Sequence, residues 1–185
     1  MTDIAGKAEW IQAVLCRYEG SLLRYATHLT GDLDRARDAV QETFLGLCQQ
    51  EPSRVEDHLA AWLFRVCRNR ALDLRRKEKP VEPLESSSAA TLPSPEPGPA
   101  VLAERREGTS QVLAVVESLP ETQREVLTLR FHSGLSYREI SEVTGHSVSH
   151  VGVLLHNAVK NVRARLADPA VTRDARSPIS AGGAR

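Results

Sequence analysis

Two segments of the chain carry side chains suited to contacting a phosphate backbone. Residues 61–79 hold seven basic and two acidic groups, and residues 158–185 hold six basic and two acidic groups. Residues 1–60 and 80–157 are acidic, so the net charge of zero conceals an uneven distribution. Phosphates respond to local positive charge. The two basic segments therefore indicate two nucleic-acid contacts, although ordinary solvated helix faces would have the same composition.

A second pattern, within residues 141–155, has the spacing of a DNA-binding helix-turn-helix. Ser141 is a small residue where two helices would cross, Gly145 permits a sharp turn, and Val151 is an inward aliphatic residue. A simple helical hairpin would share this spacing. The outward side chains of the second helix, which could enter a major groove, are Ser149, His150, Val153, His156, Asn157 and Lys160.

Other reactive side chains do not form a catalytic or metal-binding set. His146, His150 and His156 lie close together in sequence, but no carboxylate or thiol joins them, so we expect no metal. Cys48 and Cys67 lie on or beside apolar stripes and are expected to be inert core thiols. No phosphate-binding loop, paired acids or nucleophile-base pair is present. We expect neither enzymatic activity nor a cofactor.

Apolar residues at helical spacing predict an all-α fold with two small domains. The first domain, residues 1–79, has helical patterns over about 10–30, 33–49 and 59–77. Asp32 or Asp34 can cap the second of these helices. The third is expected to bury Leu59, Trp62, Leu63, Val66, Cys67 and Leu74. The second domain, residues 110–167, contains a capping box from Ser136 to Glu139 and a last helix that reaches about Leu166.

Between the domains, residues 80–109 contain six of the ten prolines and a run of three serines. Proline fixes φ and lacks a backbone donor, so this segment is predicted to be a flexible linker, with a helical lead-in at 101–106. Residues 168–185 are predicted to be a basic disordered tail. No apolar run approaches the roughly 20 residues that span a bilayer, and the odd, widely spaced cysteines are typical of a reduced, cytoplasmic protein.

Four stretches resemble bacterial sigma factors. Residues 34–45 (DRARDAVQETFL) resemble region 2.2, and residues 61–76 (AWLFRVCRNRALDLRR) resemble regions 2.3 and 2.4. Residues 119–127 (LPETQREVL) and 134–140 (GLSYREI) resemble regions 4.1 and 4.2. Nothing corresponds to region 1.1 or to domain 3. The extracytoplasmic-function (ECF) group of the sigma-70 family is therefore the closer match.

The resemblance implies a factor that directs core RNA polymerase to promoters and promotes DNA melting. Its partners would be the β′ clamp helices and β flap of core polymerase, promoter DNA and an anti-sigma factor. The residues implied to bind core polymerase are Asp38, Gln41, Glu42 and Leu45. Those implied to bind the minus-10 element are Arg65, Arg68, Asn69, Asp73 and Arg76. The minus-35 element would be contacted by Arg138 and by the outward side chains of the last helix.

The last helix departs from the family pattern, in which residues close to Thr-Val-Lys-Ser-Arg-Leu follow the serine cap. This chain has HVGVLL at 150–155, with Gly152 and Leu154 at the lysine and arginine positions. Minus-35 binding would then be weaker, or would be carried by other basic side chains of the domain: Arg124, Arg130, Arg138, Lys160, Arg163 and Arg165. Alternatively, Val153 and Leu154 would pack against a protein. A stand-alone helix-turn-helix regulator and a polymerase-binding adaptor are the alternatives to a sigma factor.

Overall fold

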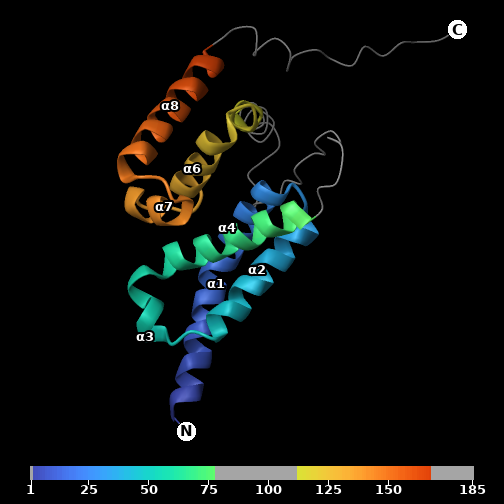
Figure 1. The fold of residues 1–185 in the computed structure, drawn as a ribbon, viewed down its shortest axis with the longest axis vertical. Coiled ribbons are helices and arrows are strands. Elements are labelled where there is room, and N and C mark those ends of the chain that lie inside the picture. Colours follow the sequence, from blue (N-terminus) through green and yellow to red (C-terminus); the bar gives the residue numbers. More distant parts are fainter. Residues whose placement is uncertain (1, 78–111, 168–185) are drawn as a thin grey trace, which may run out of the picture. The chain divides into compact units, whose positions relative to one another are not determined.

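The computed structural model describes residues 2–77 and 112–167, and within these ranges it contains helices and turns but no strand (Figure 1). The all-α prediction is confirmed. The predicted linker at 80–109, the helical lead-in at 101–106 and the tail at 168–185 lie outside the described residues. The predicted domain boundaries therefore stay a prediction.

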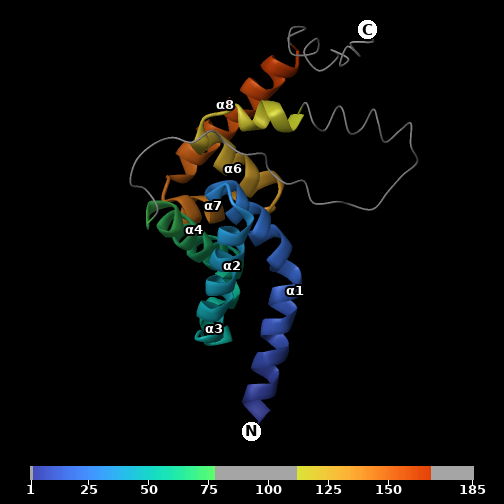
Figure 2. The ribbon, with the colours of Figure 1, turned by 90° about the vertical axis from the view of Figure 1, so that its right-hand side faces the viewer.

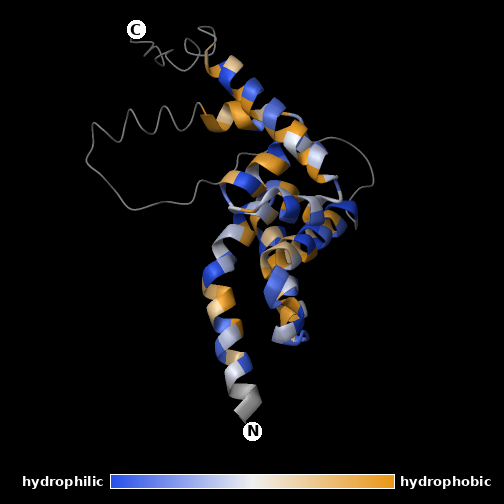
Figure 3. Cartoon of the chain, turned by 90° about the vertical axis from the view of Figure 1, so that its left-hand side faces the viewer, coloured by the Kyte–Doolittle hydropathy of each residue, from blue (hydrophilic) through white to orange (hydrophobic). Residues whose placement is uncertain are grey.

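The first two helices are α1 (Thr2–Thr30) and α2 (Leu33–Cys48). Figure 2 shows α1 as a long rod beside α2, and Figure 3 shows apolar and polar stretches alternating along it. Gly31 ends α1 with a φ of 71°, a left-handed conformation that glycine adopts without strain. Asp32 is the N-cap of α2, since its carboxylate accepts the Arg35 N–H at 2.9 Å. Of the two capping residues predicted, Asp32 is the one used.

Residues 52–58, between the second and third predicted helical patterns, are also helical. They consist of the short helix α3 (Pro52–Val55) and the 3-10 turn η1 (Glu56–His58), followed directly by α4 (Leu59–Lys77). Proline at the first helical position favours the turn because its φ is already set. Val55 is 3% exposed and anchors the segment.

Helices α1, α2 and α4 contact one another pairwise and surround a core of aliphatic and aromatic side chains. The buried residues of α2 form one stripe: Ala36, Ala39, Val40, Thr43, Phe44 and Leu47. In α4 the prediction is only partly right. Leu63 and Cys67 are buried as expected, whereas Leu59, Trp62, Val66 and Leu74 are half-buried.

Phe64, which the pattern did not assign to the core, is fully buried, with its ring centroid 5.4 Å from that of Tyr25.

The two cysteines predicted to be core thiols differ in their exposure to solvent. Cys48 is exposed because it is the last residue of α2, so that prediction is wrong. Burial raises the pKa of the Cys67 thiol to about 12, and its hydrogen bond with Thr43 offsets only part of this.

The remaining described helices are α6 (Glu121–Phe131), α7 (Tyr137–Thr144) and α8 (Val148–Leu166), preceded by a helical stretch at 112–117. α6 begins directly after Pro120, whose carbonyl accepts the Arg124 N–H at 3.0 Å. Gly134, with a φ of 71°, follows α6 in a left-handed conformation. The fully buried side chains of these helices include Val126, Leu129, Ile140, Val151 and Ala158.

Candidate nucleic-acid interface

The predicted minus-10 residues lie along one side of α4. Their spacing of three or four residues places them on successive turns of the helix. Arg65, Asn69 and Arg76 are exposed, and Arg68 and Asp73 are half-buried. The Asp73 carboxylate lies 2.6 Å from an Arg76 guanidinium nitrogen, so Asp73 orients that arginine within this face. The face therefore presents positive charge and one amide to solvent.

Trp62 lies at the edge of this face and is half-buried. Its ring reaches α2, since a Cβ placed on Gly46 would lie 3.7 Å from the far end of the indole. A methyl group at position 46 would therefore be in ordinary van der Waals contact with the ring. This contact with α2 favours a packing role for Trp62, which lies two turns before Asn69 on the same side of α4.

The four predicted polymerase-binding residues form an exposed stripe on α2. Asp38, Gln41, Glu42 and Leu45 follow the i, i+3, i+4, i+7 spacing of one helix face, and all four are exposed. Leu45 is 56% exposed, an unusual position for a leucine unless a partner covers it. The Glu42 carboxylate is already paired, with the Arg70 Nε 3.1 Å away on α4. This ion pair joins the stripe to α4.

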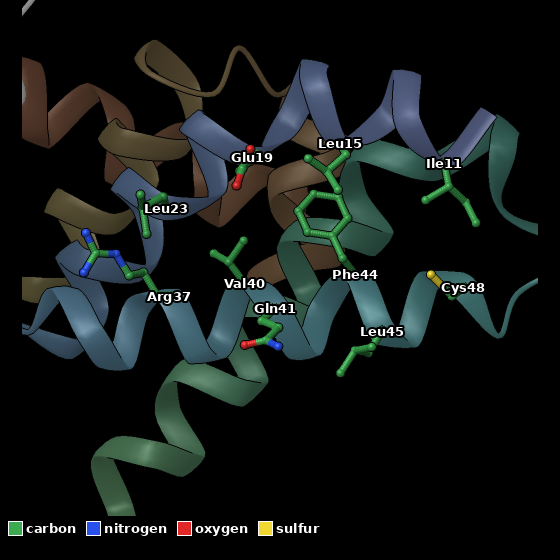
Figure 4. A pocket seen from close by; sticks show the side chains of 10 residues that line it. All are labelled: Ile11, Leu15, Glu19, Leu23, Arg37, Val40, Gln41, Phe44, Leu45 and Cys48. Atoms are coloured by element: carbon green, nitrogen blue, oxygen red, sulfur yellow. The ribbon is translucent and has the colours of Figure 1, made fainter. Parts of the chain in front are cut away.

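An open groove of about 460 Å³ runs between α1 and α2 beside this stripe (Figure 4). Its floor includes Leu15 from α1 and Phe44 from α2, whose side chains point toward each other. Gln41 and Cys48 lie on the α2 side of the groove, and Leu45 extends away from α1. The sequence analysis did not find this groove, because it depends on where two helices diverge.

The turn between α7 and α8 has the geometry that the sequence predicted. Ser136 and Glu139 form the capping box at the start of α7, with bonds of 3.2 and 2.7 Å. Gly145 ends α7 with a φ of 79°, and the Ser141 hydroxyl donates to the His146 carbonyl at 2.6 Å. Ser147 then caps α8 by accepting the His150 N–H at 3.2 Å. These local bonds hold the turn of a helix-turn-helix in place.

Residues predicted to face the minus-35 element are exposed. Val153 is 54% exposed, and Ser149, His150, His156, Asn157 and Lys160 are also exposed along α8. Val151, Leu155 and Ala158 form the opposite, buried side. Arg138 on α7 is exposed and lies 3.5 Å from the Glu142 carboxylate.

The rings of His146 and His150 pack edge to face, with their centroids 5.0 Å apart. No group of three possible metal ligands occurs within the described residues.

Two departures from the family pattern behave differently in the structure. Leu154 is 9% exposed and belongs to the buried side of α8, whereas Gly152 is half-buried at the edge of the exposed side.

Three of the arginines considered as alternative minus-35 contacts donate hydrogen bonds to backbone carbonyls. Arg124 bonds to Glu117 at 3.0 Å, Arg130 to Leu135 at 2.9 Å, and Arg165 to Ser118 at 3.1 Å. These guanidinium groups therefore satisfy backbone carbonyls that lie at or beyond the ends of helices.

Comparison with known proteins gives the family. Residues 15–81 match the family model described as "Sigma-70 region 2", and residues 109–162 match "Sigma-70, region 4". The chain is 35% identical over 148 residues to the ECF RNA polymerase sigma factor EcfG of Rhodopseudomonas palustris, covering 79% of both proteins. It is 32% identical over 173 residues to the ECF RNA polymerase sigma factor SigL of Mycobacterium tuberculosis, covering 91% of this chain and 96% of that protein. The chain belongs to the ECF sigma factors.

The solved structure of CnrH in complex with the cytosolic domain of CnrY shares the fold of this sigma factor. It has a TM-score of 0.59 and 23% identity, and the match covers 95% of each chain. The regulator alternative is not supported, because the region 2 match accounts for the amino-terminal helices. This sigma factor therefore works with RNA polymerase and promoter DNA in transcription initiation. Within the described residues, no helix is both long and apolar enough to cross a membrane.

Sequence reasoning missed two features of this sigma factor: the groove between α1 and α2, and Arg70 as a link between α2 and α4. The sequence analysis assigned Arg70 to no partner. A pairing between residues 28 positions apart leaves no periodic signal. The opposite charges of Glu42 and Arg70 could have suggested it only after the helices had been placed side by side.

Proposed function

We propose that this sigma factor divides its work among three helices: α2 binds core polymerase at the β′ clamp helices, α4 holds the melted minus-10 strand, and α8 enters the minus-35 major groove. This proposal rests on the exposure of the side chains assigned to each partner. The side chains on each assigned face are exposed or half-buried, while the opposite faces of α2 and α8 are buried. Each helix can therefore offer its assigned face to a partner without unfolding.

The chemistry of each face suits its proposed partner. On α2, the acidic and amide groups around exposed Leu45 provide orientation and an apolar contact for a protein helix. On α4, Arg65 and Arg76 supply phosphate contacts, and the Asn69 amide can hydrogen-bond to an unpaired base. On α8, neutral hydrogen-bonding groups dominate, which suits reading base edges more than binding phosphates.

The α2 assignment is tested by the triple variant Asp38→Ala, Gln41→Ala, Leu45→Ala. It leaves Glu42 in place because the ion pair with Arg70 contributes to packing between helices. We expect pull-down of core polymerase to fall at least about tenfold, with helical content unchanged by circular dichroism. Glu9→Ala, an exposed acidic position on α1, is the control. Unchanged polymerase binding by the triple variant would refute the α2 assignment.

The α4 assignment is tested by promoter opening. Asn69→Ala and Arg65→Ala should lower permanganate reactivity of minus-10 thymines while polymerase binding stays normal. Arg24→Ala, which removes one exposed positive charge from α1, is the charge-matched control. Normal melting by both α4 variants would contradict the assignment.

We further propose an anti-sigma factor as a partner, working in the cytoplasm where core polymerase is found, and contact between the region 4 helices and the β flap. The solved complex of CnrH with the cytosolic domain of CnrY supports the first point, since CnrH has the same fold. We propose no catalytic activity for the chain itself. Polymerase supplies the chemistry, and the sigma factor supplies binding energy and position.

A further inference from the structure

The exposed face of α8 carries no lysine or arginine over residues 149–157. An α-helix turns by about 100° per residue, so Ser149, Val153, His156 and Lys160 share one narrow strip. Val153 lies at the middle of this strip and is 54% exposed, although valine gains nothing from contact with water. Lys160, two turns further on, is the one lysine or arginine among the six α8 residues assigned to DNA.

Lys160 and Arg163 are exposed near the carboxyl end of α8, and three other arginines of this part of the chain make bonds within it. Arg130 and Arg165 donate to backbone carbonyls at 2.9 and 3.1 Å, and Arg138 lies 3.5 Å from Glu142. Leu154 occupies the buried side of the helix. An interface with few phosphate contacts must draw more of its selectivity from base edges.

Two neutral side chains on this face match the edges of an A·T pair. Thymine alone presents a methyl group in the major groove, and an apolar side chain such as that of Val153 can contact it. A carboxamide such as that of Asn157 can pair with N6 and N7 of adenine through two hydrogen bonds. The two residues are four apart, so they are neighbours on the helix surface.

The spacing of these side chains also fits neighbouring base pairs. Four residues correspond to about 6 Å along a helix axis, and base pairs are stacked about 3.4 Å apart. Val153 and Asn157 can therefore reach positions one or two steps apart in the same groove. Exposed Asn157 and Val153 need no rearrangement of the helix to do so.

We infer that α8 selects its minus-35 element by A·T pairs, with Val153 against a thymine methyl and Asn157 on an adenine one or two base pairs away. This inference rests on the proposed function, which places α8 in the major groove. Val153 and Asn157 are then the residues that determine specificity, and Lys160 contributes affinity that does not depend on sequence.

The test uses holoenzyme reconstituted from core polymerase and the full chain. The first step is selection from a promoter library randomised over the minus-35 element, which identifies the preferred sequence. Each thymine of that sequence is then replaced by deoxyuridine, which lacks the methyl group, and each adenine by 7-deazaadenine, which lacks N7. Binding of each duplex is measured with wild type, Val153→Ala, Asn157→Ala and Lys160→Ala.

We expect deoxyuridine at one position to weaken wild-type binding about fourfold, the effect of one buried methyl group. Val153→Ala should bind the two duplexes about equally, because the partner of the methyl group is gone. Asn157→Ala should weaken binding about 5- to 150-fold and remove sensitivity to 7-deazaadenine at one position. Lys160→Ala should weaken binding to all sequences alike and lower the log-log salt slope by about one.

The outcomes separate this inference from the proposed function. If no minus-35 sequence is enriched, the assignment of α8 to that element fails. If G·C pairs are enriched, or if wild type ignores every deoxyuridine substitution, the inference fails while the assignment stands. Retained methyl sensitivity in Val153→Ala would also overturn it. Because the duplex substitutions leave the protein unchanged, a folding defect in a variant cannot decide the result.

Discussion

Replacing Leu154 by arginine is the most direct test of how α8 is oriented. The family pattern places a basic residue at this position, which suggests that arginine would strengthen minus-35 binding. The structure predicts the opposite, because Leu154 is 9% exposed while its neighbour Val153 is 54% exposed. An arginine at 154 would lose the apolar contacts of leucine and carry a charge into the same space.

The size of the effect follows from these two losses. Full burial of a leucine side chain contributes about 1.5–3 kcal/mol, and a guanidinium that cannot reach water adds a desolvation cost. The long arginine side chain relieves part of that cost by extending toward solvent. We expect a total loss of about 3–5 kcal/mol, which is a large part of the 5–15 kcal/mol typical of a whole domain.

Thermal unfolding of the full chain, followed by circular dichroism, measures this loss. For a domain of about 60 residues, 1 kcal/mol corresponds to a Tm change of about 4–8 °C, so Leu154→Arg should lower the Tm of the transition that includes α8 by about 12 °C or more. Val153→Arg is the matched control, with an expected change within about 0.5 kcal/mol. A Tm for Leu154→Arg within about 2 °C of wild type would show that the side chain is not buried.

Three further variants test the positions that hold the helices together. Cys67 has a pKa raised to about 12 by burial, so above pH 9 the unfolded chain loses a proton that the folded chain keeps. Stability should therefore fall by up to about 1.4 kcal/mol per pH unit more in wild type than in Cys67→Ala, as measured by urea unfolding between pH 9.5 and 11. Gly145→Ala should cost about 1–2 kcal/mol because of its φ of 79°, with a smaller loss for Gly145→Asn, and equal Tm values for both would contradict this. Arg70→Glu should cost up to about 1 kcal/mol and be restored by adding Glu42→Arg, and additive losses in the double variant would argue against the ion pair.

Helix ends were predictable from sequence because the interactions that form them are local. Asp32, Ser136 and Gly145 act on residues no more than four positions away, and each was found at its predicted place. The outward face of α8 was equally predictable, since a single helix repeats with one period. Side chains that contact distant parts of the chain were not predictable in the same way.

Phe64 illustrates this limit. The segment 62–67 is apolar at most positions, so several faces of α4 looked equally suited to the core, and only contact with Tyr25 on α1 selects one of them. The arginines of the second domain show the same limit for the candidate site. Arg130 and Arg165 looked suited to phosphate contacts, but their guanidinium groups bond to carbonyls whose positions depend on the tertiary fold.

The short connection at Gly31 and Asp32 has a consequence for how quickly the amino-terminal helices can form. Helices α1 and α2 are sequence neighbours joined by two residues, and α4 follows after a short helical segment, so most contacts in the bundle are close in sequence. Helical bundles of this kind fold in microseconds to milliseconds. Synthesis of the 89 residues from position 78 to Leu166, where α8 ends, takes roughly four seconds or more at the usual ribosomal rate. We therefore expect the α2 stripe, which we propose binds polymerase, to be able to fold before α8 has been made.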